Sequence, residues 1–128
     1  METKEKLSAL HSEHNEWQNK IKFYRDELKE FNTQLTGLVS KTAPNDVLVS
    51  VEHFQNQFIR QNEVLDIMRH DFKQHENKIE ALQENGQSNG VDINALHAEE
   101  KERLEHFEKL FQELRNEFHL FLNNVPVS

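Results

Sequence analysis

Apolar residues recur along the chain at alternating steps of three and four positions, in three separate series. The first series consists of Leu7, Leu10, His14, Trp17, Ile21, Tyr24, Leu28, Phe31, Leu35 and Leu38. The second consists of Val47, Val51, Phe54, Phe58, Gln61, Leu65, Met68, Phe72, His75, Ile79 and Leu82. The third consists of Ile93, His97, Glu100, Leu104, Phe107, Phe111, Leu114, Phe118, Phe121 and Val125. This heptad rhythm puts each series on one helix face and is typical of helices that pack side by side.

Helix-breaking residues separate the three series and set the expected helix ends. Gly37 closes the first series, and we expect it to take the left-handed conformation that ends many helices. The segments Ser40–Asp46 and Asn85–Gly90 are rich in turn-forming residues and predict the two connections. Asp92 is expected to cap the third helix. The predicted helices cover residues from about 4 to 36, 45 to 84 and 93 to 123.

Short connections between these helices predict that consecutive helices run antiparallel. The chain has 128 residues, an ordinary size for one domain, and its three Gly and two Pro are too few for the turns of a β-sandwich or barrel. We therefore predict an all-α, antiparallel up-down-up bundle of three long helices with heptad packing, in which residues 1–128 form a single domain. With Trp17 in the seam of the first helix, this layout is similar in outline to a spectrin-type repeat.

Charge and composition exclude several classes of function. The chain has 23 Asp and Glu against 15 Lys and Arg, a net charge of −8, so we expect no binding to nucleic acid or to an anionic membrane. No stretch is apolar enough for a signal peptide or a membrane span, which favours a cytoplasmic protein. The absence of Cys excludes disulfides and thiolate catalysis. Phosphate-binding loops and nucleophile motifs are also absent, so the sequence does not indicate an enzyme.

Four polar residues interrupt the apolar seams, and helix-pairing arithmetic places them at one level. In an antiparallel pair, the seam position opposite residue 14 is about 71, and the one opposite residue 75 is about 101, to within one helical turn. The four residues expected in this layer, near the second connection, are His14, His75, His97 and Glu100. The same arithmetic places Gln61 opposite Tyr24, where an amide and a hydroxyl would satisfy each other.

Imidazole and carboxylate groups in one layer suit a transition metal such as Zn, Fe or Mn. Asp71 and His11 lie one helical turn from His75 and His14 and are candidate supporting ligands. The candidate metal ligands are therefore His14, His75, His97, Glu100, Asp71 and His11. Another interpretation is a buried polar network that fixes the helix register without an ion. A third is haem held by two of the histidines.

Three apolar residues outside the seams indicate a protein contact. Phe23, Ile59 and Ile67 take outward positions at comparable levels of the first two helices. Single exposed apolar residues are normal, but a contiguous strip would suit a homodimer or another helix. The leading hypothesis is therefore a non-enzymatic structural or protein-interaction bundle that binds a protein partner or self-associates. The alternative is a metal-binding bundle built on the polar layer.

Overall fold

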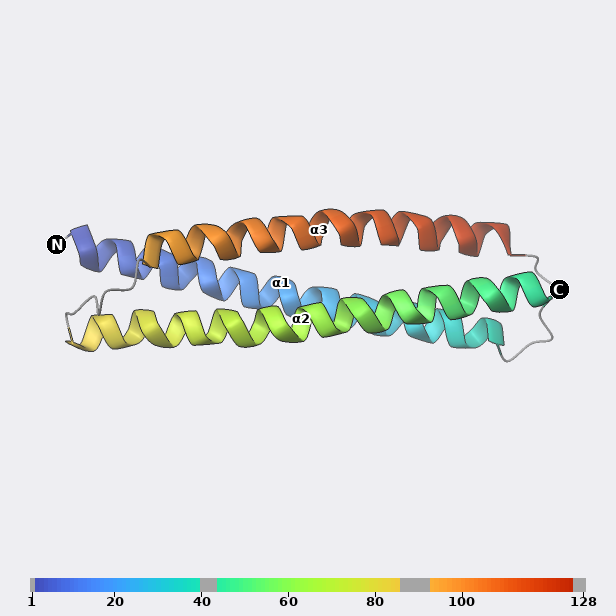
Figure 1. Ribbon diagram of the computed structural model, residues 1–128, viewed down its shortest axis with the longest axis horizontal. Helices are drawn as coiled ribbons and strands as arrows, with labels where there is room; N and C mark the ends of the chain where they lie inside the picture. Colours follow the sequence, from blue (N-terminus) through green and yellow to red (C-terminus); the bar gives the residue numbers. More distant parts are fainter. Residues whose placement is uncertain (1, 40–43, 86–92, 126–128) are drawn as a thin grey trace.

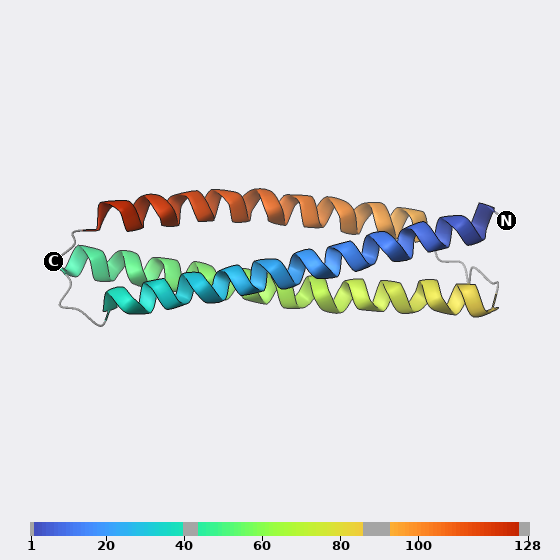
Figure 2. The same cartoon turned by 180° about the vertical axis from the view of Figure 1, so that it is seen from behind.

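The computed structural model describes residues 2–39, 44–85 and 93–125, which form three long α-helices (Figure 1). Helix α1 comprises Glu2–Val39, α2 comprises Asn45–Asn85 and α3 comprises Ile93–Asn124. Two opposite views show that consecutive helices run in opposite directions and that α1 and α3 are parallel (Figures 1 and 2). The predicted all-α, up-down-up bundle is thus confirmed.

The first helix extends beyond its predicted end. Gly37 lies inside α1 without a left-handed backbone, so its predicted role as the residue that ends the helix is wrong. Helix α1 continues to Val39 because Leu38 still packs against the apolar core. At the start of α2, the Leu48 amide donates a hydrogen bond of 3.1 Å to the Pro44 carbonyl. The predicted cap Asp92 and most of both connections lie outside the described residues.

Residues of the three heptad series form the core. The apolar side chains that are at most 2% exposed are Ile21, Leu28, Leu35, Phe58, Leu65, Met68, Phe72, Ile79, Leu104, Phe111 and Phe118. Phe31, Phe58 and Phe118 pack together with ring centroids 5.1–5.6 Å apart. Burying each such side chain stabilises the fold by about 1.5–3 kcal/mol, so the heptad seams supply the main driving force for the bundle.

The register between α1 and α2 differs from the predicted one by about one helical turn. Trp17 packs on Phe72 with ring centroids 5.3 Å apart, and His14 lies 4.6 Å from His75 rather than opposite position 71. Tyr24 faces α3, where its hydroxyl donates a hydrogen bond to Glu108, so its predicted partnership with Gln61 is wrong. Aromatic packing decides this register, since large rings fit only where the facing helix leaves space.

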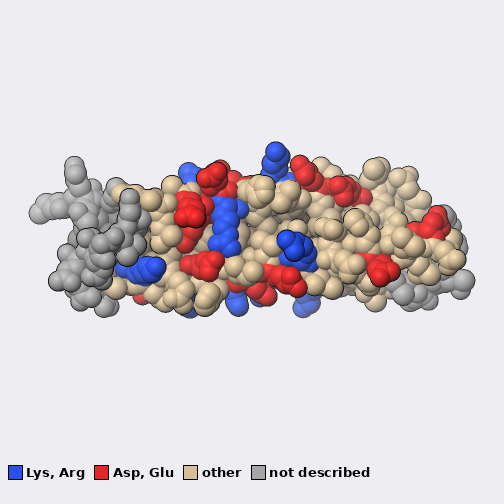
Figure 3. Space-filling model, viewed as in Figure 1, with Lys and Arg blue, Asp and Glu red and all other residues tan. Residues whose placement is uncertain are grey.

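The surface is charged, and the two signs are mixed. On the face shown in Figure 3, acidic and basic side chains interleave along the rod, and no basic patch gathers there. Neither α1, α2 nor α3 has, in its described residues, the length and hydropathy that crossing a membrane requires.

Candidate metal centre

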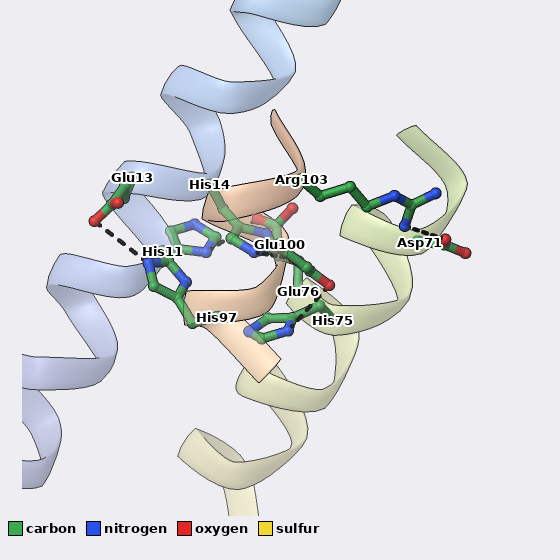
Figure 4. Close-up of polar contacts among 9 residues, drawn as sticks. All are labelled: His11, Glu13, His14, Asp71, His75, Glu76, His97, Glu100 and Arg103. Carbon is green, nitrogen blue, oxygen red and sulfur yellow. Dashed lines mark hydrogen bonds and ion pairs between the residues drawn. The ribbon is translucent and has the colours of Figure 1, made fainter. Parts of the chain in front are cut away.

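The four polar seam residues meet in one layer between the helices (Figure 4). His14 comes from α1, His75 from α2, and His97 and Glu100 from α3. Their exposed fractions are 0%, 1%, 8% and 5%, respectively. The heptad arithmetic therefore identified the four side chains that meet in this layer, although the register of α1 against α2 differs from the predicted one by about one helical turn.

The three imidazoles lie close enough to share one ion. One ring nitrogen from each of His14, His75 and His97 lies within 4.8 Å of the other two. The ring centroids are 4.6 Å apart for His14 and His75, 5.8 Å for His14 and His97, and 5.9 Å for His75 and His97. A tetrahedral Zn²⁺ with Zn–N bonds of about 2.0–2.1 Å holds its nitrogens about 3.4 Å apart, so modest side-chain movement would close the site.

Glu100 lies between two of these imidazoles. Its Oε2 is 3.2 Å from His14 Nε2, and its Oε1 is 3.3 Å from His75 Nδ1. Burial by itself raises the pKa of this carboxyl, but the facing imidazoles outweigh burial and lower the pKa below its ordinary value. Glu100 is therefore a carboxylate at neutral pH and offers negative charge inside the core.

The imidazole nitrogens of the layer form no well-aligned hydrogen bonds, although one nitrogen of each ring faces a carboxylate oxygen at 3.2–3.4 Å. Both ring nitrogens of His14, His75 and His97 are buried without such a bond, and so is Glu100 Oε2, because the contacts with carboxylates are poorly aligned. A buried polar group without a partner costs about 1–3 kcal/mol, and native proteins contain few of them. A cluster of such atoms at one point marks a place where a ligand would supply the missing interactions.

His97 has two neighbours that the sequence did not predict. Its Nε2 lies 3.4 Å from Glu13 Oε2, and its ring stacks on Trp17 with centroids 4.5 Å apart. Burial lowers the pKa of His97, while Glu13 opposes that shift. Pairing only consecutive helices missed both contacts. Helices α1 and α3 run parallel, so facing residues differ by a nearly constant number of positions. Applying that rule to α1 and α3 would have found both contacts.

The two predicted supporting ligands have other partners. Asp71 accepts a hydrogen bond of 2.7 Å from Arg103, to one side of the layer (Figure 4). His11 Nδ1 lies 3.0 Å from Glu76 Oε1, and these two residues form with Glu80 a second, more exposed group of possible ligands. The structure therefore brings together four of the six candidates and leaves Asp71 and His11 beside them.

A surface cavity of about 300 Å³ between α2 and α3 reaches this layer. Its inner lining includes His75 and Glu100, and its outer lining includes Asp71, Glu99 and Arg103. The lining has three carboxylates, Asp71, Glu99 and Glu100, against the two cationic side chains of Lys78 and Arg103, which leaves a small excess of negative charge.

Comparison with known proteins gives no family for this chain. No family model, no curated protein and no solved structure matches it. The likeness to a spectrin-type repeat therefore rests on the order of the helices and on the seam position of Trp17.

Proposed function

We propose that this protein is a metal-binding helical bundle that holds one transition-metal ion, in the first place Zn²⁺. The ligands would be His14, His75 and His97, with Glu100 as the fourth. Three imidazole nitrogens and one carboxylate oxygen are a ligand set that Zn²⁺ accepts in tetrahedral geometry. The observation that carries the proposal is the convergence of three buried imidazoles, with one nitrogen of each within 4.8 Å of the other two.

A polar network without an ion accounts less well for this layer. Each neutral imidazole has one donor and one acceptor, and an acceptor needs an N–H or O–H group to face it. The groups facing these rings are the carboxylates Glu100 and Glu13 and the other rings. The three rings have three N–H donors, and if these face the carboxylates, the three remaining nitrogens have no donor opposite them, whereas a metal ion takes the lone pairs of all three rings at once.

The ligand types also rank the candidate metals. Mn²⁺ prefers sites with more oxygen ligands, whereas imidazole suits Zn²⁺ and its neighbours among the later transition metals. Haem is disfavoured because His14, His75 and His97 lie ring against ring, 4.6–5.9 Å apart, under Trp17 and Phe72. A porphyrin would have to displace this packed layer.

Metal analysis and thermal melts of matched variants test the proposal. The wild-type protein, dialysed against Zn²⁺, should retain about one ion per chain, and a Zn²⁺ concentration 1,000 times Kd should stabilise it by about 4 kcal/mol. His75→Leu should lose both effects. The stabilisation is measured from the metal-free melting temperature of each variant, because His75→Leu also takes a partner from the buried Glu100 carboxylate.

His70→Gln is the matched control, because His70 lies on the same helix with its side chain exposed. It should retain the ion and the stabilisation. A wild-type protein that retains no ion, or a His75→Leu variant that retains it as well as the control, would contradict the proposal.

A second candidate function is self-association through exposed apolar side chains. Phe23, Ile59 and Ile67 are 59%, 57% and 54% exposed, as expected for an outward-facing strip. Ile59 and Ile67 are eight residues apart on α2 and therefore share a helix face. This role as a structural or interaction protein is compatible with metal binding, since the polar layer lies inside the bundle.

A further inference from the structure

The cavity between α2 and α3 connects the surface to two of the proposed ligands. His75 and Glu100 line its inner part although they are only 1% and 5% exposed. One ring nitrogen of His75 faces the Glu100 carboxylate at 3.3 Å and the other has no partner, so a ligand with a spare lone pair lines a cavity that is open to solvent. A buried metal site needs an access path, and this cavity provides one on the α2–α3 side of the layer.

One ion pair spans the outer part of this cavity. Arg103 of α3 donates to Asp71 of α2, and the two side chains are 39% and 42% exposed. An ion pair at this exposure stabilises the fold by no more than about 1 kcal/mol, so it opens often. When Arg103 moves away, the Asp71 carboxylate becomes available one helical turn from His75, with Glu99 in the same lining.

We propose that this cavity is the access route of the ion and that Asp71 is its outer binding residue. Asp71 takes the hydrated divalent cation at the surface, and the cation then passes to His75 and Glu100. Arg103 closes the route by occupying Asp71. This inference rests on the proposed function, and it gives Asp71 a role in exchange rather than in the final ligand set.

Rates of ion binding test this role because Trp17 provides a direct signal. Trp17 is the single tryptophan of the chain, and it stacks on His97 with ring centroids 4.5 Å apart. Cu²⁺, a paramagnetic ion that imidazole sites bind tightly, would quench its fluorescence from the layer. Stopped-flow mixing with Cu²⁺ gives the association rate, and a chase with chelator gives the dissociation rate.

Opposite effects are expected for the two partners of the ion pair. Asp71→Asn should slow association and dissociation by the same factor, about three- to tenfold, and leave Kd unchanged within twofold. Arg103→Gln should speed both rates, because it leaves Asp71 free to take the ion in either direction. Equal changes in both rates identify an access route, whereas a final ligand would change Kd.

Asp66→Asn is the matched control for charge. Asp66 is also exposed and pairs with Arg25 across α1 and α2, but it does not line the cavity. It should leave both rates within twofold of the wild type. Equal slowing by Asp66→Asn, an unchanged rate in Asp71→Asn, or a weaker Kd in Asp71→Asn would each overturn the route.

The wild-type titration separates the two proposals. Quenching that saturates at one Cu²⁺ per chain and is lost in His75→Leu supports the site itself, whatever the rates in Asp71→Asn. Absence of quenching at stoichiometric Cu²⁺ would overturn the site and the route together.

Discussion

His97 occupies a position in which protonation is unfavourable. Burial lowers the pKa of its imidazole, and Glu13 offsets this only in part. In the unfolded chain a histidine has a pKa of about 6.5, so the unfolded chain takes up this proton at a higher pH than the folded protein does. Stability should therefore fall as the pH drops below about 6.5. The lowered pKa of Glu100 acts in the same direction at more acidic pH, because its contribution is lost as that carboxylate is protonated.

Urea unfolding of the metal-free protein, followed by Trp17 fluorescence, measures this dependence. Between pH 7.5 and pH 5.5 the free energy of unfolding should fall, with a slope of at most about 1.4 kcal/mol per pH unit for each proton. His97→Phe keeps a ring against Trp17 and should flatten the slope. A wild-type protein that is equally stable at both pH values would contradict this account of His97.

Between helices, half-buried polar contacts hold α3 to α1. Arg115 makes two hydrogen bonds to the Glu27 carboxylate, and its guanidinium lies 5.2 Å from the centre of the Phe111 ring. The hydrogen bonds to Glu27 raise the pKa of Arg115 further, so the guanidinium stays charged. The two side chains are only 21% and 17% exposed. Such a two-pronged contact fixes both the spacing and the register of the parallel helices.

Arg115→Met should lower the free energy of unfolding by about 1–2 kcal/mol, since it leaves the half-buried Glu27 without its partner. Arg25→Met is the control, because Arg25 and Asp66 form a more exposed pair between α1 and α2. That control should cost about 0.5 kcal/mol or less. Urea titrations of the two variants compare them directly, and equal losses would show that burial does not decide the strength of these pairs.

The sequence predicted the helices and the polar layer because the heptad rhythm reports which face of each helix is buried. It placed His14 and His75 at one level because α-helices rise by a constant length per residue. The sequence did not predict which individual side chains contact each other between helices. The contacts of Tyr24 with Glu108 and of Glu13 with His97 join α1 to α3, which are not consecutive in the chain. The predicted helix end at Gly37 was wrong because Leu38, the next residue, still packs against the core.

At the scale of the whole molecule, the rod has exposed apolar side chains beyond the predicted three. Val49 is 68% exposed and Leu120 is 64% exposed, near the end of the bundle opposite the polar layer. Neither was predicted as a contact residue. Phe23, Ile59 and Ile67 lie nearer the polar layer than these two residues do, and Ile67 is one helical turn from Asp71 on α2.

Sedimentation at several protein concentrations tests self-association. If the strip forms a dimer interface, the wild-type protein should shift from monomer to dimer as its concentration rises, and the paired change Ile59→Glu and Ile67→Glu should abolish the shift. Glu at these exposed positions leaves the core intact, so the variant's melting temperature serves as the folding control. A wild-type protein that stays monomeric throughout would remove the strip as a dimer interface.

The polar layer also divides the rod into two unequal lengths. Ile79 is fully buried but lies beyond His75, outside the apolar cluster that contains Trp17 and Phe72. Among the side chains described past the layer, Ile79 is the one buried apolar residue, so we expect the backbone there to open at a lower free energy than the middle of α2. An ion bound to residues from all three helices would cross-link the helices near this end, and the backbone on both sides of the layer would then open together.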